Sequence, residues 1–502
     1  MRFWLFAMAC LLVCACTPRT SSPDPDGGAN PALRIAVITD LKGYLEPCGC
    51  TSRPLGGIDR MAAEVRSLRE SRAPVLLVMG GDLFFDAAPV EPARLDQANR
   101  NAQTLVQILN GLEVSAALPG ARDRAQRAET LATLQAEASF PWLAMSGDAE
   151  VVRVQAGGVR VAIVGVRPGA DPDAVLAAVG TAQAETDLTI AVVSGSRRDA
   201  NRVAAVSGVD FVIQGGLDED EPVPPHGSGQ GWVLHAGRQG QGLTVVDVYR
   251  KGTGPFVDAS AWSRGVREKS LDAQIADLSV KIDAWKKEGV DPSDLQVQAD
   301  RLAGFERERE ALQGPAPAIE GNAFSAEWVE LDPDKASDPK VSGLMKAHDK
   351  VVNDANRVAF ADLKPPPLGP GDIPYVGSKA CSTCHVSAFA WWQTHPHGRA
   401  YETLETRNKE FNLDCVGCHV TGYNEPGGST VTWNLDGALE NVGCESCHGP
   451  GGAHVKDPSK QVVRDPPEPA CVGCHNEEHS DQFDYEKYRQ SVIVPGHGAP
   501  LQ

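Results

Sequence analysis

The feature that most constrains this 502-residue chain is a short motif, C-x-x-C-H, which occurs four times in its last quarter. Two thiols at this spacing reach both vinyl groups of one porphyrin, and the histidine that follows turns back to ligate the iron. The pattern therefore predicts four covalently bound haem c cofactors. The copies are Cys381-Ser-Thr-Cys384-His385, Cys415-Val-Gly-Cys418-His419, Cys444-Glu-Ser-Cys447-His448 and Cys471-Val-Gly-Cys474-His475.

Zinc is the alternative occupant, because cysteine pairs with a nearby histidine also ligate zinc. Four repeats in which the histidine always follows the second cysteine directly favour haem. Residues 372–502 are rich in glycine and proline and carry few helix or strand signals. We therefore expect a mostly irregular, partly α-helical multihaem cytochrome c domain, whose core is made by the macrocycles and which does not fold without them.

Counting residue types reduces the number of candidates for the sixth ligand of each iron. No methionine follows Met345, so methionine ligation from within the domain is excluded and bis-histidine iron is expected at most sites. The absence of methionine ligation removes one factor that raises midpoint potentials, so low potentials are expected. Five candidate histidines cannot be assigned to four irons from the sequence. Alternatively, one iron has no sixth ligand and is five-coordinate. The candidates are His395, His397, His454, His479 and His497.

The N-terminus has the pattern of an export signal. Arg2 precedes an apolar run from Phe3 to Ala15, which is too short to span a bilayer as a stable helix. Val13-Cys14-Ala15-Cys16 resembles a bacterial lipobox, so residues 1–16 are interpreted as a lipoprotein-type signal peptide with lipidation at Cys16; ordinary cleavage is the alternative. Residues 17–32 are expected to be a disordered tether. Either interpretation predicts an extracytoplasmic, periplasmic body, which the lipid anchor would hold at a membrane.

Charge and cysteine usage exclude some classes of partner and scaffold. The formal net charge of −19 argues against a nucleic-acid partner and suits cationic or neutral proteins as electron donors and acceptors. Of thirteen cysteines, three lie in the signal segment, eight in the motifs, and Cys48 and Cys50 are left over. The cysteines therefore do not form a disulfide scaffold.

Spacer residues around the motifs carry a family resemblance. The stretches are Tyr375-Val-Gly-Ser-Lys-Ala-Cys-Ser-Thr-Cys-His, Trp391-Trp-Gln-Thr-His-Pro-His-Gly-Arg-Ala-Tyr-Glu-Thr-Leu and Val442-Gly-Cys-Glu-Ser-Cys-His-Gly-Pro-Gly. About a quarter of the chain thus resembles the cytochrome c-554 family. The resemblance implies stacked haem pairs that relay electrons, mostly with bis-histidine ligation and sometimes with one five-coordinate iron. By position, His397, His454 and His497 resemble its distal ligands, and His395 and His479 are weaker candidates.

Residues 33–250 alternate short β-branched runs with longer amphipathic stretches, which predicts a layered α/β domain. Strands are expected at 34–39, 75–79, 159–166, 188–193, 211–213 and 243–248, and helices at 58–69, 94–112 and 128–136.

The middle of the chain has a different composition. Residues 266–313 combine heptad-like spacing with a turn, which predicts an antiparallel helical hairpin. This hairpin is a packed spacer or, alternatively, a partner-binding coiled coil. A connecting segment over 314–371, with a helix near 341–360, leads through a stiff proline-rich stretch to the haem domain at 372–502.

The α/β region resembles the metallophosphatase domain of 5'-nucleotidases. The stretches that carry the resemblance are Ile38-Thr-Asp-Leu-Lys-Gly-Tyr, Gly56-Gly-Ile-Asp-Arg, Gly80-Gly-Asp, Leu118-Pro-Gly-Ala-Arg-Asp and Val209-Asp-Phe-Val-Ile-Gln-Gly-Gly-Leu. The resemblance implies a four-layer α/β/β/α sandwich over residues 33–250 that normally holds two metal ions.

This sequence departs from the family at most metal-ligand positions. Asp40 and Asp82 are retained, but the other positions hold Lys42, Ala121, Arg122, Gly195 and the pair Leu217 and Glu219, and the domain has only His226 and His235 to offer. A dinuclear site needs several carboxylate and imidazole ligands. We therefore expect phosphoesterase activity to be lost, with Lys42 and Arg122 filling the vacated space as an anion site; a surviving metal-dependent 5'-nucleotidase is the alternative.

Cys48-Gly49-Cys50 lies in the loop that approaches the metals in this family. The combination resembles nucleotidase-like redox proteins that accompany multihaem cytochromes. Two thiols at this spacing suit an easily reduced disulfide, a metal site or a nucleophile, and a structural disulfide or inert pair is the alternative. The leading hypothesis is electron transfer; an oxidoreductase that uses Cys48 and Cys50 or an open haem is the second.

Overall fold

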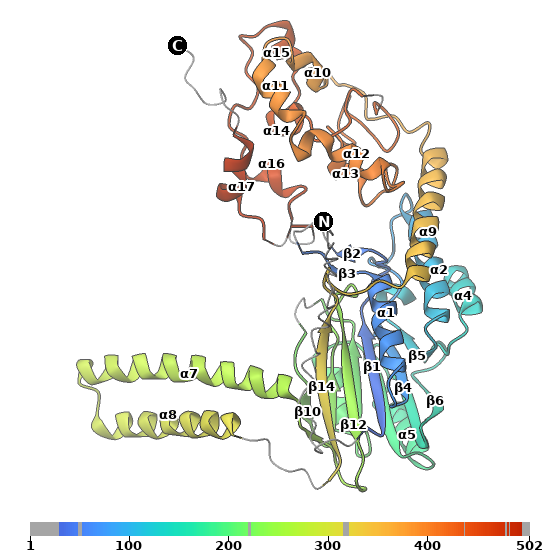
Figure 1. The fold of residues 1–502 in the computed structure, drawn as a ribbon, viewed down its shortest axis with the longest axis vertical. Coiled ribbons are helices and arrows are strands. Elements are labelled where there is room, and N and C mark those ends of the chain that lie inside the picture. The colour runs from blue at the N-terminus through green and yellow to red at the C-terminus, as the bar shows by residue number, and fades with distance from the viewer. Residues whose placement is uncertain are drawn as a thin grey trace, which may run out of the picture.

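The computed structural model describes residues 30–48, 53–218, 222–314, 321–435, 437–476, 479–480 and 482–493 (Figure 1). Predictions for the signal segment, most of the tether, Cys16, Cys50, Glu219 and His497 fall on residues outside these ranges. Of Cys48, only the backbone position is described.

Two six-stranded sheets form the centre of the N-terminal domain. The first has the order β13 (Val257–Asp258), β14 (Ala323–Glu330), β12 (Gly242–Tyr249), β1 (Leu33–Thr39), β4 (Val75–Gly81) and β5 (Val114–Pro119). The second has the order β10 (His226–Ser228), β11 (Gly231–Leu234), β9 (Phe211–Gly215), β8 (Leu188–Ser194), β7 (Val159–Val166) and β6 (Ala149–Ala156). Strand β1 pairs in parallel with β4 and antiparallel with β12.

Alternating side chains of β1 bury both faces of the first sheet. Ile35 and Val37 belong to the cluster between the two sheets, with Ile163 and Ile190 of the second sheet. Ile38 points the other way, into the cluster under the covering helices. A strand buried on both faces carries apolar residues continuously, which is why LRIAVIT has no polar alternation.

Helices cover the outer faces of both sheets (Figure 1). The first sheet is covered by α1 (Ile58–Arg69) and α2 (Leu95–Asn110), and the second by α5 (Pro172–Gln183) and α6 (Arg197–Ala204). The short elements α3 (Ala121–Arg124), α4 (Ala128–Glu137), β2 (Pro47–Cys48) and β3 (Leu55–Gly56) complete this part of the chain. The predicted four-layer α/β/β/α class is confirmed.

The sandwich also includes residues that the sequence analysis placed in a connecting segment. Strand β14 pairs with β12 along its full length, from Gly242↔Glu330 to Tyr249↔Ala323. Helix α9 (Pro339–Ala359) buries Val341 in the same cluster as α1 and α2. The expected helix near 341–360 is therefore present, but it and β14 pack as parts of the sandwich. The separation of β14 from β12 by an inserted hairpin hid this pairing from sequence reasoning.

The predicted helical hairpin is formed by α7 (Ala261–Glu288) and α8 (Pro292–Gln313), and it projects from the side of the sandwich (Figure 1). Gly289 ends α7 at a φ of 76°, in the left-handed region that glycine favours. Asp291 caps α8 by accepting a hydrogen bond from the Ser293 N–H. Leu271 and Leu278 of α7 are buried, and α7 packs along α8. Among the described residues, no helix is long and apolar enough to cross a membrane.

Short helical segments make up the C-terminal domain. They are α10 (Ser378–Cys381), α11 (Val386–Trp392), the 3-10 turn η1 (Pro396–Arg399), α12 (Ala400–Glu405), α13 (Val416–His419), α14 (Cys444–His448), α15 (Gly452–Lys456), α16 (Pro469–Val472) and α17 (Tyr485–Val492). The buried cluster here contains just Tyr401, Leu404, Val416, Val420 and Val431. The apolar side chains of this domain form a small core, and the sequence predicts that haem fills the rest of the interior.

Candidate functional site

Each haem motif forms or adjoins one helical turn. In the first motif the His385 N–H donates to the Cys381 carbonyl at 2.9 Å, and in the fourth the His475 N–H donates to the Cys471 carbonyl at 2.9 Å. Residues three positions apart lie on one face of a helical turn. The local fold therefore points both thiols of a motif to one side, where one macrocycle would be attached.

The first motif faces a distal candidate at a distance that fits one iron. The His385 and His454 ring centres are 6.2 Å apart, with 30° between the ring planes. Two imidazoles that ligate one metal from opposite sides, through bonds of about 2 Å, have ring centres roughly 6 Å apart. The two rings leave the space that a single iron needs.

The fourth motif has an equivalent partner. The His397 and His475 ring centres are also 6.2 Å apart, with 53° between the planes. His397 is the first of the favoured distal candidates and comes from η1, far from His475 in sequence. The structure thus brings together two pairs, each made of one motif histidine and one predicted distal histidine.

Backbone carbonyls fix the orientation of several of these rings. The Nδ1 atoms of His419, His448 and His454 lie 2.6, 2.6 and 2.7 Å from the carbonyls of Ala400, Val463 and Lys460, respectively. A carbonyl can only accept, so each Nδ1 carries the hydrogen and Nε2 keeps its lone pair. Ligating histidines commonly have this outer hydrogen bond, so the residues present fit haem iron.

The weaker candidates have other contacts. His395 stacks on Trp391 with ring centres 4.5 Å apart, and its Nδ1 accepts the backbone N–H of His397 at 3.2 Å. It therefore supports the turn that carries His397. The backbone N–H of His479 donates to Asn476. His497 lies outside the described residues.

Cysteines of different motifs lie beside one another. The Cys381 and Cys444 thiols interact, as do those of Cys418 and Cys474, and Cys447 interacts with Cys471. Helix α14 of the third motif also contacts α16 of the fourth. The first motif therefore neighbours the third, the third neighbours the fourth, and the fourth neighbours the second.

The segment just before the second motif is fixed to the sandwich. Gln97 of α2 donates to Asp414 Oδ2 at 2.8 Å and accepts the Leu413 N–H at 3.0 Å. Arg94 forms an ion pair with Asp414, which directly precedes Cys415. Asn356 of α9, which is buried, donates to the Phe411 carbonyl at 2.9 Å.

A buried lysine adds a second anchor at this joint. Lys409 is 9% exposed, and its Nζ lies 3.1 Å from Glu46 and 3.5 Å from Asp349. Burial raises the pKa of Asp349 to about 6. Glu46 stands two residues before Cys48 in the loop that follows β1. The second motif is thus tied to the loops at the haem-domain end of the sandwich (Figure 1). Sequence reasoning missed this joint, since no local pattern marks it.

The retained aspartates of the metallophosphatase-like site are deeply buried. Asp40 Oδ1 accepts hydrogen bonds from the backbone N–H groups of Asp82 and Gly216, at 2.9 and 2.8 Å. Burial raises the pKa of Asp40 to about 7. His235 Nε2 lies 4.0 Å from Asp40 Oδ2. His226 bonds to Asn201 elsewhere on the domain.

Side-chain cations lie beside these aspartates. Arg122 donates its backbone N–H to Asp82 Oδ1 at 2.8 Å, and its guanidinium lies 3.4 Å from Asp82 Oδ2. Lys42 Nζ lies 2.8 Å and Arg122 Nη2 lies 2.9 Å from the same atom, Asp218 Oδ1. Leu217 and Glu219 were the residues predicted at this position, and Asp218, which lies between them in the sequence, was not predicted. In the described parts of the chain, no three His, Cys, Asp or Glu side chains are grouped as metal ligands.

A glycine keeps this site compact. Gly81 has a φ of 91°, and a Cβ at this position would lie 2.2 Å from Asp40 Oδ1. Asp123, the last residue of one of the stretches that resemble the metallophosphatase family, is fully buried and accepts the N–H groups of Leu83, Phe84 and Gly120. It orders the loop after β4, and burial raises its pKa to about 7.

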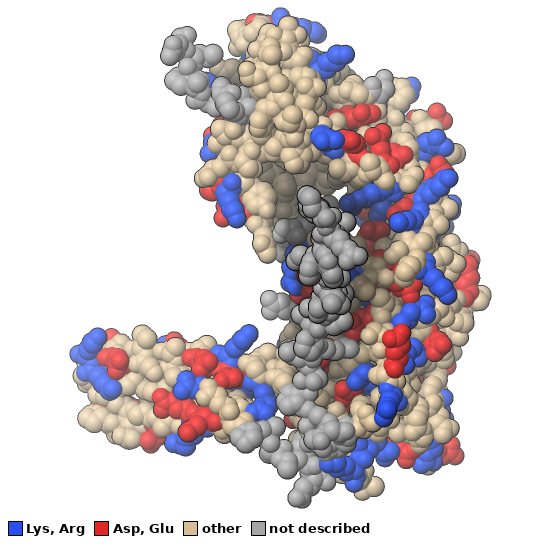
Figure 2. Space-filling model, viewed as in Figure 1, with Lys and Arg blue, Asp and Glu red and all other residues tan. Residues whose placement is uncertain are grey.

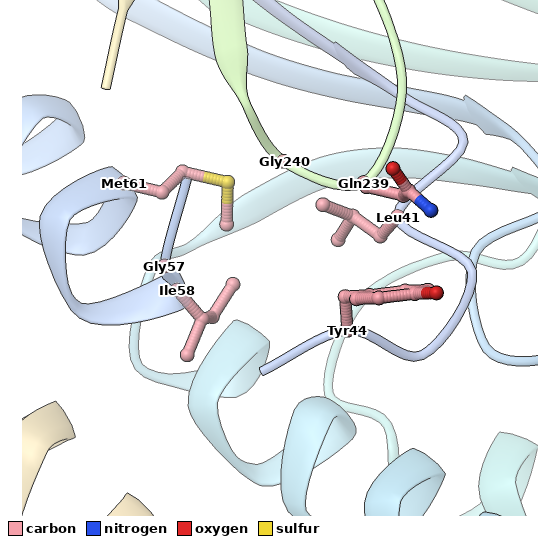
Figure 3. A pocket seen from close by; sticks show the side chains of 7 residues that line it. All are labelled: Leu41, Tyr44, Gly57, Ile58, Met61, Gln239 and Gly240. Carbon is pink, nitrogen blue, oxygen red and sulfur yellow. The ribbon is translucent and has the colours of Figure 1, made fainter. Parts of the chain in front are cut away.

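A small pocket lies beside the loop after β1 (Figure 3). Leu41, Ile58 and Met61 line it with apolar side chains, and Tyr44 and Gln239 add polar ones. It leaves no room for even a water-sized molecule. It is therefore not a nucleotide-binding pocket in this conformation.

Comparison with known sequences concerns the C-terminal part. Residues 380–449 match the family model described as cytochrome c554 and c-prime. The chain is 38% identical over 95 residues to cytochrome c-554 of Nitrosomonas europaea, which covers 16% of this chain and 40% of that protein. The chain thus spans less than half of this relative, and the predicted resemblance to the family is confirmed for this segment.

Comparison with solved structures gives two similar proteins from Thermus thermophilus. A sulfate thiohydrolase aligns with a TM-score of 0.38 and 15% identity, over 45% of this chain and 55% of that one. A 5'-nucleotidase precursor aligns with a TM-score of 0.41 and 14% identity, over 69% of this chain and 61% of that one. Each neighbour is covered over less than two thirds of its length. The fold assignment itself follows from the layers and strand orders given above.

Proposed function

We propose that this chain, whose residues 380–449 match the cytochrome c554 and c-prime family, transfers electrons outside the cytoplasm through four covalently bound c-type haems. The observation that carries the proposal is the pair of 6.2 Å separations, His385 to His454 and His397 to His475. Each pair combines a motif histidine with a distal histidine predicted from sequence. Bound haem supplies the one-electron chemistry.

The side chains divide the remaining work. The eight motif cysteines hold the macrocycles, and His385, His419, His448 and His475 are the proximal ligands. Carbonyls that accept from Nδ1 keep Nε2 of His419, His448 and His454 available for iron. His454 and His397 serve the first and fourth motifs; the second and third are left with His497 and His479 as candidates, or with an open position.

Location and partners follow from the N-terminal segment and the charge. The export pattern and Cys16 support a lipid-anchored periplasmic protein. The acidic chain, with a net charge of −19, suits cationic donor and acceptor proteins and not nucleic acid.

The sandwich is proposed to lack phosphoesterase activity. Lys42 and Arg122 place positive charge at positions where the family holds metal ligands, and Asp218 neutralises them. A dinuclear centre would have to displace both cations. Nucleotide hydrolysis with added manganese, abolished by Asp82→Ala, would contradict this part of the proposal.

A second candidate, an oxidoreductase that uses Cys48 and Cys50, is favoured by one contact. Glu46, two residues before Cys48, pairs with Lys409 at the second motif. In this function, two ferrous haems would give up two electrons, and a small disulfide such as cystine with two protons would become two thiols. Cystine-dependent haem reoxidation that is lost in Cys48→Ser would support it, and reoxidation unchanged by that substitution would exclude it.

The leading proposal is tested on the protein matured in a host that attaches c-type haem. A pyridine haemochrome assay should give four haems per chain, and electron paramagnetic resonance should show low-spin ferric iron from at least the first and fourth motifs. Fewer than four haems would overturn the tetrahaem assignment. A spectrum with only high-spin iron would overturn the bis-histidine pairs.

A further inference from the structure

Two cations in the sandwich meet at a single oxygen atom. Lys42 Nζ and Arg122 Nη2 lie 2.8 and 2.9 Å from Asp218 Oδ1. Hydrogen bonds from two charged donors to one anionic oxygen are among the stronger polar contacts in proteins. They lower the pKa of Asp218 to about 2, so the carboxylate stays charged. This oxygen marks a position that is favourable for negative charge.

The two sides of this contact differ in how firmly they are held. The Lys42 side chain is 7% exposed, whereas that of Asp218 is 71% exposed. Lys42 also has a φ of 53°, a strained conformation for a residue with a side chain. Its backbone N–H donates to the Asp82 carbonyl at 2.9 Å, which holds the loop in that conformation. The cations are therefore built into the domain, and their counter-ion is a surface side chain.

The burial of Lys42 explains why a negative charge must lie near its ammonium group. A lysine ammonium removed from water is costly unless an opposite charge compensates it. Asp82 lies 3.4 Å from the Arg122 guanidinium, and Asp40 accepts two backbone N–H groups through Oδ1, whereas its buried Oδ2 has no hydrogen-bond partner among the described residues. Among the described carboxylates, Asp218 is the one that forms an ion pair with Lys42 Nζ, and it does so from the solvent side.

We propose that Lys42 and Arg122 form a binding site for a small tetrahedral oxyanion, and that Asp218 occupies it as an internal stand-in until the ligand displaces it. One ligand oxygen would take the place of Asp218 Oδ1. The exposed Asp218 side chain can move into water without unfolding the sheets, because it follows the end of β9. The site needs no metal ion and does not depend on the haem assignment.

The ligand class follows from the donors. Arginine presents a planar fork that matches two oxygens of phosphate or sulfate, and lysine adds a point charge. Free phosphate or sulfate and the terminal phosphate of an ester share this chemistry. The nearby carboxylates of Asp40 and Asp82 add negative charge, so we expect modest affinity for the wild-type protein.

The test is calorimetric titration of the full haem-loaded chain with sodium sulfate, inorganic phosphate and adenosine monophosphate, at constant ionic strength. Removal of the stand-in by Asp218→Asn should tighten binding by about tenfold, because the competing carboxylate is lost. Asp148→Asn is the matched control, since Asp148 pairs with Arg167 on the same domain at 2.6 Å. It should leave binding unchanged.

Two further measurements keep the result decisive. Lys42→Met combined with Asp218→Asn should abolish the gain, while the haem absorbance stays that of the wild type. Thermal unfolding of the unmodified protein should shift upward with sulfate but not with chloride at matched ionic strength. Equal affinity in the wild type and Asp218→Asn, or a gain that survives loss of Lys42, would overturn the proposal. Binding of the ester but not of inorganic anions would assign the site to phosphate esters.

Discussion

The two ends of this molecule obtain their interiors in different ways. The sandwich buries apolar side chains in three clusters, between its sheets and under the helices on both sides. The haem domain has one small cluster of five buried side chains. On the face shown in Figure 2, its surface has a wide uncharged area beside an acidic patch, whereas the hairpin carries both signs throughout. One region therefore has an interior made by its own side chains, and the other is expected to obtain its interior from cofactors attached at fixed spacings.

The largest expected effect is that the C-terminal domain does not fold without haem, whereas the sandwich does. If the protein is made in a host that cannot attach haem, residues 372–502 should stay unfolded, because the one small apolar cluster among the described residues of this range cannot offset the entropy of ordering a domain of this size. The sandwich should still fold. Limited proteolysis should leave a stable fragment that ends near Ala359. A protease-resistant C-terminal domain without haem would contradict the comparison.

A cavity in the sandwich should destabilise the sandwich and leave the haem domain folded. Ile190 is fully buried between the sheets, so Ile190→Ala should lower the free energy of unfolding of the sandwich by about 2–5 kcal/mol. Far-ultraviolet circular dichroism during urea unfolding would measure it, and the haem absorbance should keep its native form in the absence of urea. Val280→Ala on the hairpin, where the side chain is 71% exposed, serves as the control and should have little effect.

Within the haem domain, two histidine substitutions should have different effects on the iron spin state. His454→Ala should convert one haem from low-spin to high-spin iron, because the His385 ring would lose the partner that lies 6.2 Å away. His395→Ala should leave the number of low-spin haems unchanged, since His395 supports the turn that carries His397. Electron paramagnetic resonance distinguishes the two variants. A high-spin signal in His395→Ala alone would reverse the assignment.

The joint between the regions offers a milder perturbation. Gln97→Ala removes the bonds to Leu413 and Asp414, and about 1–3 kcal/mol of coupling should be lost because the Leu413 N–H and the buried Asn356 amide lose the Gln97 oxygen as an acceptor. The two regions should then unfold at more widely separated temperatures, measured by circular dichroism and haem absorbance. Gln103→Ala on the exposed face of the same helix is the matched control, and identical behaviour of both variants would show that the joint is weak.

The last prediction is a pH dependence confined to the sandwich. The pKa of Asp40 is about 7 in the folded chain, and about 4 is usual for an unfolded aspartate. Between these values the folded state holds the proton and the unfolded state releases it, so stability falls as pH rises from about 4 to about 7.

Asp40→Asn should make this decline shallower, because asparagine can still accept the two backbone hydrogen bonds without ionising. The remaining slope would come from the other carboxyls whose pKa is raised by burial, which include Asp123 at about 7 and Asp210 and Asp349 at about 6. Urea unfolding at several pH values measures the slope. An unchanged slope in Asp40→Asn would show that this carboxyl is already ionised.

Sequence reasoning reached those features that are encoded locally. The haem motifs are recognisable because their chemistry fixes the spacing of three residues, and helix α1 was predicted at its observed bounds because its apolar face repeats regularly. Strand β14 was not recognised, since its partner β12 lies across an inserted hairpin. The pairing of His454 with the first motif, the role of Asp218 and the contacts of Lys409 all depend on distances between segments remote in sequence.

The place of β14 and α9 in the chain also sets an order of assembly. The last strand of the sandwich ends at Glu330 and its last covering helix at Ala359, whereas the first haem cysteine is Cys381. Domains generally fold as units, the N-terminal one first. Every segment that the sandwich needs is therefore available before any haem cysteine emerges. If the sandwich folds first, the motif thiols would become accessible for haem attachment after that domain has closed, and α9 would already present Asn356 to the segment before the second motif.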